Sequence, residues 1–255
     1  MKLLDNRPVA VSGGGRGMGA AMARACAREG APVAVLDLPS DEGQAVADEI
    51  TSSGGTAVFI ACDISDEAQV KAAFTAIDTQ FGGLYGLCNV AGINHQANVL
   101  DMELEAWNHM MAVNVRGMVL TMKYALPLMR KHGSGSIVNM ASVSGMIGSV
   151  GYAAYHTTKG AVMALTRSVS QEFVADNVRV NAVAPGWVNT RFTDDALART
   201  DDPEGIRAKA GDFHALGRMA EPHEVAEAAV FLLSDDASFV TAETLFVDGG
   251  FMIKR

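Results

Sequence analysis

Short apolar runs alternate with longer stretches of helical periodicity along almost the whole chain. Strands are expected at 9–12, 32–37, 56–62, 84–89, 135–142, 178–184 and 244–248. Helices are expected at 20–29, 66–81, 103–132, 152–175 and 221–233. This alternation predicts an α/β fold of the Rossmann type: a doubly wound, seven-stranded, mostly parallel sheet with helices on both faces. The chain shows no linker or repeat, so one domain is expected over residues 1–255.

Two segments interrupt the pattern. Pro127 lies inside the long helical pattern at 103–132 and is expected to break it. Residues 187–217 are polar, Asp-rich and weakly periodic, and their length favours a substrate-binding loop region. Four apolar side chains in that region either wall a pocket or pack the loop down: Trp187, Phe192, Leu197 and Phe213.

A glycine cluster joins the first strand to the first helix. Glycines let the backbone approach a pyrophosphate, and the helix N-terminus that follows offers unpaired N–H groups. A glycine cluster by itself is a weak signal, but the next strand ends in an acid about twenty residues downstream, as dinucleotide binding requires. Cofactor contacts are therefore expected from Gly13, Arg16, Gly17, Met18 and Gly19.

The acid at the end of the second strand is Asp37. Its carboxylate can accept both hydroxyl hydrogens of a ribose and would repel a 2′-phosphate, which favours NAD(H) over NADP(H). Arg16 points the other way, because a guanidinium can pair with a 2′-phosphate, but the residue after Asp37 is Leu38 and adds no second cation.

Composition and charge narrow the class of protein. A formal charge of −9 and a pI near 5.1 argue against nucleic acid or an anionic membrane as a partner. Cys26, Cys62 and Cys88 lack the spacing of a metal site and are expected to be buried thiols in a reducing compartment. No metal is therefore expected. No apolar stretch reaches membrane-spanning length and no signal-peptide core is present, so a cytoplasmic location is expected.

Ser142, Tyr155 and Lys159 are the candidate proton-transfer group. Tyr155 and Lys159 lie four apart in an apolar helical stretch and so share one face. An ammonium about 4 Å from a phenol contributes about 4 kcal/mol at an effective dielectric of about 20, which is expected to lower the phenol pKa toward neutrality. The residues alone leave three competitors open: Tyr152 as the phenol, and Ser144 and Ser149 as the hydroxyl.

Taken together, the motifs resemble those of the compact short-chain dehydrogenases/reductases from Val9 to Gly250. The matches, in order, are Ser12-Gly13-x-x-x-Gly17-x-Gly19, Asp63, Asn89-Val-Ala91-Gly92, Asn114, Ser142, Tyr155-x-x-x-Lys159, Pro185-Gly186 and Val247-Asp-Gly-Gly250. The small departures are Ser12, Val90 and Thr241-Ala242, where threonine, asparagine and Thr-Gly are commoner, and none touches the proton-transfer group.

The resemblance implies the roles of the catalytic residues. Tyr155 would be the general acid/base, Lys159 would lower its pKa and hold the nicotinamide ribose, Ser142 would orient the substrate oxygen, and Asn114 would hold a relay water. Residue patterns alone favour a purely structural role for Asn114. For Asp63 they allow a contact with the adenine, a cap on the next helix, or both. The remaining cofactor contacts expected are Ile64, Asn89, Ala91, Gly92, Pro185, Gly186, Val188 and Thr190.

The predicted function is NAD(H)-dependent interconversion of a secondary alcohol and a ketone. The substrate is left open between a sugar or polyol, a cyclic alcohol and a 3-oxoacyl thioester, with a pocket expected from His95, Ser142, Val143, Met146, Tyr155, Trp187 and Phe192. Rival functions are a non-catalytic nicotinamide-binding sensor and an epimerase or dehydratase. The family also implies a homotetramer built on the helices at 103–132 and 152–175.

Overall fold

The structure, a computed structural model, describes residues 2–198 and 202–254. Residues 1, 199–201 and 255 lie outside the described residues. Of these, 199–201 belong to the loop region predicted at 187–217. Seven strands form one sheet: β1 (Val9–Ser12), β2 (Val33–Asp37), β3 (Ala57–Ala61), β4 (Gly86–Asn89), β5 (Gly135–Met140), β6 (Val178–Pro185) and β7 (Thr244–Val247). Their order is β3-β2-β1-β4-β5-β6-β7, and every pairing is parallel. The predicted fold is confirmed, with a sheet that is wholly parallel.

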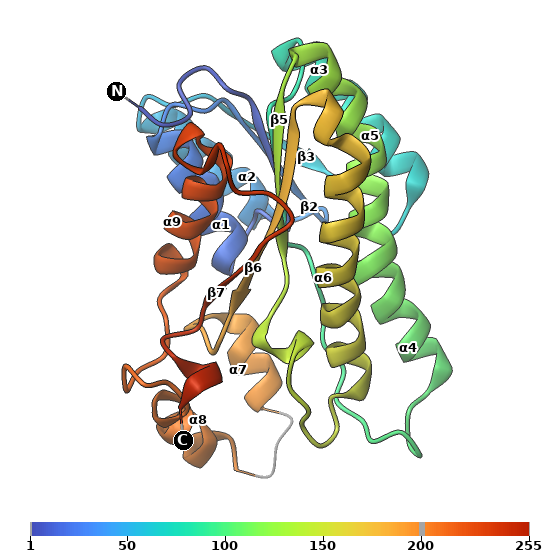
Figure 1. The fold of residues 1–255 in the computed structure, drawn as a ribbon, viewed down its shortest axis with the longest axis vertical. Helices are drawn as coiled ribbons and strands as arrows, with labels where there is room; N and C mark the ends of the chain where they lie inside the picture. Colours follow the sequence, from blue (N-terminus) through green and yellow to red (C-terminus); the bar gives the residue numbers. More distant parts are fainter. Residues whose placement is uncertain (1, 199–201, 255) are drawn as a thin grey trace.

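Helices cover both faces of the sheet (Figure 1). On one face α1 (Gly17–Arg28), α2 (Asp41–Ser52) and α9 (Pro222–Leu233) share a core with the sheet. On the other face lie α3 (Glu67–Phe81), α5 (Gly117–His132) and α6 (Ala153–Phe173), with α4 (Leu104–Met111) packed against α6. Because parallel strands need a crossover to return, this two-sided cover follows from the strand order.

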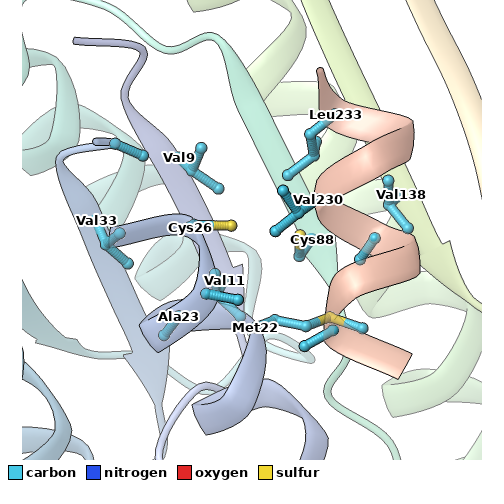
Figure 2. Close-up of a cluster of buried hydrophobic side chains, with 14 of the residues drawn as sticks. Val9, Val11, Met22, Ala23, Cys26, Val33, Cys88, Val138, Val230 and Leu233 are labelled. Carbon is cyan, nitrogen blue, oxygen red and sulfur yellow. The ribbon is translucent and has the colours of Figure 1, made fainter. Parts of the chain in front are cut away.

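The sheet core on the side of α1 and α9 is filled by small and branched side chains. Figure 2 shows Cys26 of α1 and Cys88 of β4 facing Val230 of α9. All three cysteines are free and buried, as expected. Burial raises the pKa of the Cys62 thiol to about 11, which keeps that thiol protonated at neutral pH.

The long helical pattern at 103–132 is interrupted, but Pro127 does not interrupt it. α5 runs through Pro127 to His132, and the break is instead a π-helical turn at Ala112–Arg116 between α4 and α5. Buried Ala125, Leu126 and Met129 hold the helix on both sides of the proline. Tertiary packing outweighs the lost backbone hydrogen bond.

The loop region at 187–217 contains helices that the weak periodicity missed. They are α7 (Arg191–Leu197) and α8 (Pro203–Ala210), followed by a 3₁₀ turn at Gly211–Phe213. The capping residues that could have revealed them are Thr190, which accepts a hydrogen bond from Thr193 N–H, and Asp202 directly before Pro203. These helices lie beyond the carboxyl ends of the strands, at the bottom of Figure 1.

Candidate active site

A cavity of about 490 Å³ opens at the carboxyl ends of the strands, next to β1 and β4, where the strand order reverses. In open parallel sheets this switch point is where ligands bind. Almost all of the predicted cofactor residues line the cavity: Gly13, Arg16, Gly17, Met18, Gly19, Asp37, Leu38, Asp63, Ile64, Ala91, Gly92, Tyr155, Lys159, Pro185, Gly186, Val188 and Thr190. Ser142 lines it too.

The glycine loop has the backbone shape of a phosphate cradle. Gly13 and Gly17 adopt φ values of +66° and +54°, and a Cβ on Gly19 would lie 1.9 Å from the carbonyl oxygen of Gly13. The next element, α1, has no side-chain cap and no acid in its first turn. Its first N–H groups and its dipole are therefore available to an anion, which fits a pyrophosphate.

Asp37 lies at the far end of this cradle. Its carboxylate oxygens accept hydrogen bonds from Gly15 N–H and Leu38 N–H, each at 2.8 Å, which fixes the side chain at the mouth of the cavity. Arg16 is exposed and lines the same cavity. Both groups that bear on the NAD or NADP preference are therefore in place, with the acid anchored.

Asn89 is not placed as expected, whereas Asp63 is, without its alternative role as a helix cap. Asn89 does not line the cavity: its amide donates to Asn139 and accepts from Thr121 in the buried interior. The small residues that follow Asn89 form the turn beside the cavity, whereas the side-chain amide of Asn89 is hydrogen-bonded in the protein interior. Asp63 does line the cavity, but the cap of α3 is Asp66, whose carboxylate accepts from Ala68 and Gln69 N–H.

Ser142, Tyr155 and Lys159 all line the cavity. Lys159 is 3% exposed and donates to the Met140 carbonyl at 2.7 Å, with its Nζ 5.6 Å from the centroid of the Tyr155 ring. Burial lowers the pKa of Lys159 to about 8. Burial also raises the pKa of Tyr155 to about 12, although the Ser142 hydroxyl acts to lower it.

The expected lowering of the phenol pKa by the lysine is not seen in the structure, where burial is the larger effect. The ammonium is held by the Met140 carbonyl, so the loss of solvation dominates the pKa of both groups. Tyr155 is a protonated phenol at neutral pH, ready to act as an acid.

Asn114 ties the π-helical turn to the loop after β4. Its Oδ1 accepts from Ile93 N–H at 2.8 Å, and its Nδ2 donates to the Ile93 carbonyl at 2.8 Å and to Thr158 Oγ1 at 3.1 Å. Asn114 is fully buried and does not line the cavity. The contacts in the structure are those of a structural residue, placed behind the site by its π-helical backbone.

The predicted substrate pocket is partly right. Ser142, Val143, Tyr155, Trp187 and Phe192 line the cavity, whereas His95 and Met146 do not. Met146 follows a 3₁₀ turn and is 62% exposed, so its side chain points to solvent. The competing hydroxyls of Ser144, Ser149 and Tyr152 also line the cavity, so cavity lining does not separate them from Ser142 and Tyr155.

Aromatic residues from three segments border the same space. The Tyr155 and Phe192 rings lie 6.2 Å apart, Trp187 stacks on Phe213 at 6.4 Å, and Phe213 lies 6.2 Å from Phe251. Leu197 does not line the cavity, so of the four apolar loop residues three border it and one packs the loop. Phe251 was missed by the sequence analysis, although it directly follows the Gly249-Gly250 pair.

Other residues missed by the sequence analysis line the cavity from α4, the π-helical turn and α7: His109, Val113, Thr193, Asp195 and Ala196. Across residues 2–198 and 202–254, no group of three or more His, Cys, Asp or Glu side chains is placed to hold a metal ion. Within the same ranges no helix has both the length and the apolar character needed to cross a bilayer.

Comparison with known proteins matches nearly the whole chain. The family described as enoyl-(acyl carrier protein) reductase matches residues 13–252. The chain is 40% identical over 247 residues to 2-(S)-hydroxypropyl-CoM dehydrogenase 3 of Xanthobacter autotrophicus, covering 97% of each chain. It is 41% identical over 253 residues to 2,5-dichloro-2,5-cyclohexadiene-1,4-diol dehydrogenase of Sphingobium indicum, covering 98% of this chain and 99% of that one. A crystal structure of a short-chain type dehydrogenase/reductase from Mycobacterium marinum superposes with a TM-score of 0.92 at 32% identity, covering 98% and 97% of the two chains.

Proposed function

Because this chain belongs to the short-chain dehydrogenase/reductase family, we propose that it interconverts a secondary alcohol and a ketone with NAD(H) as the hydride carrier. The observation that carries the proposal is that Ser142, Tyr155 and Lys159 line the same cavity as the uncapped N-terminus of α1. One cavity thus unites an anion cradle with a proton donor. The nicotinamide supplies or takes the hydride when bound.

The chain's own residues would hold the dinucleotide along the edge of β1, β2 and β4. The backbone of Gly13 to Gly19 and the start of α1 would bind the pyrophosphate, and Asp37 would bind the adenine ribose. Gly92 has little room for a side chain, since its Cβ would lie 3.3 Å from Asn114 Oδ1 and 3.9 Å from Lys159 Nζ. Glycine at this position therefore leaves Asn114 and Lys159 undisturbed.

The proton is moved at the Tyr155 hydroxyl. During ketone reduction the protonated phenol donates to the carbonyl oxygen, while Ser142 holds that oxygen by a hydrogen bond. During alcohol oxidation Tyr155 must be ionised to take the hydroxyl proton, and the Lys159 ammonium, 5.6 Å from the centre of its ring, is the cation that favours the phenolate against the effect of burial. Exclusion of water by the aromatic border strengthens these interactions.

Asp37 is the reason to propose NAD(H) over NADP(H). Its carboxylate is anchored by two backbone N–H groups and would repel a 2′-phosphate. Arg191 also lines the cavity but lies 3.8 Å from the Glu42 carboxylate, which offsets its charge, so the cation to weigh against Asp37 is the exposed Arg16. The balance of these two charges favours the unphosphorylated cofactor.

For the substrate we propose a compact secondary alcohol, cyclic rather than long-chain. The aromatic border formed by Trp187, Phe192, Phe213 and Phe251 suits a small apolar ring. The relative that acts on a substituted cyclohexadienediol supports a ring substrate. Reduction of a 3-oxoacyl thioester stays the alternative, because the matching family is described as enoyl-(acyl carrier protein) reductase, a name that shares the acyl thioester although it refers to a C=C bond.

The wider setting is also part of the proposal. We take the chain as one domain, with residues 187–217 as its substrate loop, working as a homotetramer in the cytoplasm. Exposed apolar side chains support self-association: Leu104 on α4, Val119 on α5, Phe239 before β7 and Phe246 on the edge strand β7. Three buried, unpaired thiols support a reducing compartment.

The test is a panel of alcohols and ketones assayed with NAD(H) and NADP(H) for a change in nicotinamide absorbance. The wild type should reduce NAD⁺ with at least one cyclic secondary alcohol, and Tyr155→Phe should lower kcat by about 10³-fold or more while still binding NADH. A non-catalytic sensor would bind NADH without any turnover. An epimerase or dehydratase would convert its substrate without net change in absorbance.

A further inference from the structure

The substrate end of the cavity has a polar side as well as an aromatic one. Ser149, Tyr152 and His156 line the cavity from the segment that joins β5 to α6 and from the first turn of α6. The reaction at one carbinol uses Ser142 and Tyr155 and requires none of these three. Polar groups beyond the reacting centre of an otherwise apolar pocket usually set substrate orientation.

His156 reaches the cavity because of where α6 begins. Successive helical side chains point about 100° apart, so Tyr155 and His156 cannot both face one flat wall. α6 starts at Ala153, however, and the preceding segment folds back so that Ile147 also lines the cavity. The cavity therefore wraps around the first turn of the helix and includes both side chains.

The contacts of the His156 ring fix which nitrogen carries the proton. Its Nδ1 lies 2.7 Å from the Ile147 carbonyl oxygen. A carbonyl only accepts, so Nδ1 must be the donor, and in the neutral ring Nε2 is a bare acceptor. Burial lowers the pKa of His156, which keeps the ring neutral at pH 7.

The ring is also held in place. It stacks on Tyr152 with the ring centroids 6.2 Å apart and an angle of 22° between the planes. Among the described residues no hydrogen bond reaches Nε2, while Nδ1 is engaged. Nε2 is therefore the polar atom that His156 has left to offer to a ligand in the cavity.

We propose that Nε2 of His156 accepts a hydrogen bond from a second hydroxyl of the substrate, so that the preferred substrates are diols or hydroxyketones. This inference rests on the proposed function and adds to it the chemical class of the substrate. The group recognised is a hydrogen-bond donor, because a neutral imidazole held at Nδ1 cannot donate from Nε2. An ether of the same size would not satisfy it.

A purely structural role for His156, anchoring the segment around Ile147, makes a different prediction, and two variants separate the roles. The side-chain amide of His156→Asn can replace the Nδ1 donor to Ile147 but removes the acceptor at Nε2. The longer His156→Gln can place an oxygen near the Nε2 position and gives up the Nδ1 contact. Thr157→Ala, at the exposed neighbouring position, is the matched control.

The experiment measures kcat/KM for NAD⁺ reduction with trans-cyclohexane-1,2-diol, trans-2-methoxycyclohexanol and cyclohexanol. The diol-to-ether ratio within one enzyme is compared, so that a general loss of activity cancels. The wild type and Thr157→Ala should favour the diol about tenfold, the typical effect of one neutral hydrogen bond. His156→Asn should bring the ratio close to one, and His156→Gln should retain most of the preference.

Two outcomes overturn the proposal: a wild-type ratio near one, or a diol preference that survives in His156→Asn. If one variant does not bind NADH or does not unfold cooperatively, the proposal is judged on the diol-to-ether ratio of the wild type and of the other variant. Turnover of none of the three alcohols, with either NAD⁺ or NADP⁺, would instead contradict the proposed function itself.

Discussion

Tyr155 and Lys159 lie four residues apart on α6, yet burial moves their pKa values in opposite directions. The phenol pKa rises from 10.0 to about 12 and the ammonium pKa falls from 10.5 to about 8, so two values that are nearly equal in the free side chains move well apart. In both cases burial disfavours the charged form. The pair therefore carries an energetic cost that the sequence spacing does not show.

That cost should appear in the pH dependence of stability without cofactor. The folded-state pKa of Lys159, about 8, lies below its unfolded value of 10.5, so the folded protein binds fewer protons between these pH values. The contribution of Lys159 to the free energy of unfolding should therefore rise with pH in this window, by about 2 to 3 kcal/mol from pH 7 to pH 10, against an opposite contribution from the Cys62 thiol above pH 9. Lys159→Met should lack this rise, as denaturant unfolding at the two pH values would show.

Lys71→Met is the control for this measurement, because Lys71 is exposed on α3 and should leave the pH dependence of the wild type intact. The comparison stops at pH 10 because Tyr155 acts in the opposite sense above it. Its folded pKa exceeds the unfolded value, so its contribution to stability is lost as pH rises from 10 toward 12. An equal rise in Lys159→Met and wild type would rule out Lys159 as the source.

Asp37 gives a second prediction at this scale. Asp37→Ser removes the charge that disfavours a 2′-phosphate while Arg16 stays, so the ratio of kcat/KM for NAD to that for NADP should fall about tenfold or more. Steady-state kinetics with both cofactors measure it. Asp48→Ser, an exposed acid on α2, should leave the ratio unchanged. If Asp37→Ser also left it unchanged, Asp37 would not be the selecting residue.

At the scale of elements, the π-helical turn at Ala112–Arg116 decides where Asn114 points. A regular α-helix from 103 to 132 would rotate this side chain relative to Ile93 and Thr158. The turn instead joins α4 and α5 while Asn114 bonds to the loop after β4 and to α6. Apolar periodicity could not reveal the turn, because one inserted residue leaves the pattern on either side almost unchanged.

Asn114→Ala tests the hydrogen bonds by which the π-helical turn holds the loop after β4 and α6, here called the Asn114 joint. Three hydrogen bonds are lost and both backbone groups of Ile93 lose their partner, so the free energy of unfolding should fall by about 2 to 4 kcal/mol. Turnover should fall as well, since the same joint positions α6. Denaturant unfolding measures the first effect, with the exposed Asn108→Ala on α4 as control. A loss below about 0.5 kcal/mol would show that the joint is held by packing alone.

At the scale of the whole molecule, apolar side chains remain exposed on widely separated elements. Phe239 is fully exposed beside the edge strand β7, and Val119 is exposed on α5 on the other face of the sheet. Single exposed apolar residues are ordinary, but a bare edge strand next to an exposed phenylalanine is a surface that proteins usually cover. A homotetramer would cover both regions.

Sedimentation of the purified protein checks this. The wild type should sediment as four chains of 26.8 kDa each, and Phe239→Glu or Val119→Glu should each shift it to smaller species, because a buried charge without a partner opposes association. Lys71→Glu, an exposed change on α3, should leave the tetramer intact. A monomeric wild type would contradict the proposed assembly.

By itself the sequence determined the seven strands, the parallel sheet, the glycine cradle and the placing of Ser142, Tyr155 and Lys159 along the chain, but it missed the helices α2, α7 and α8. The features that it determined follow from local signals: apolar periodicity, glycines and an acid at fixed spacing, and motifs read in order. Tertiary structure alone decided that α5 passes through Pro127, that Asn89 and Asn114 are bonded away from the cavity, and that Phe251 lines it. These depend on contacts between residues far apart in the chain, as does the burial that sets the pKa values of Tyr155 and Lys159.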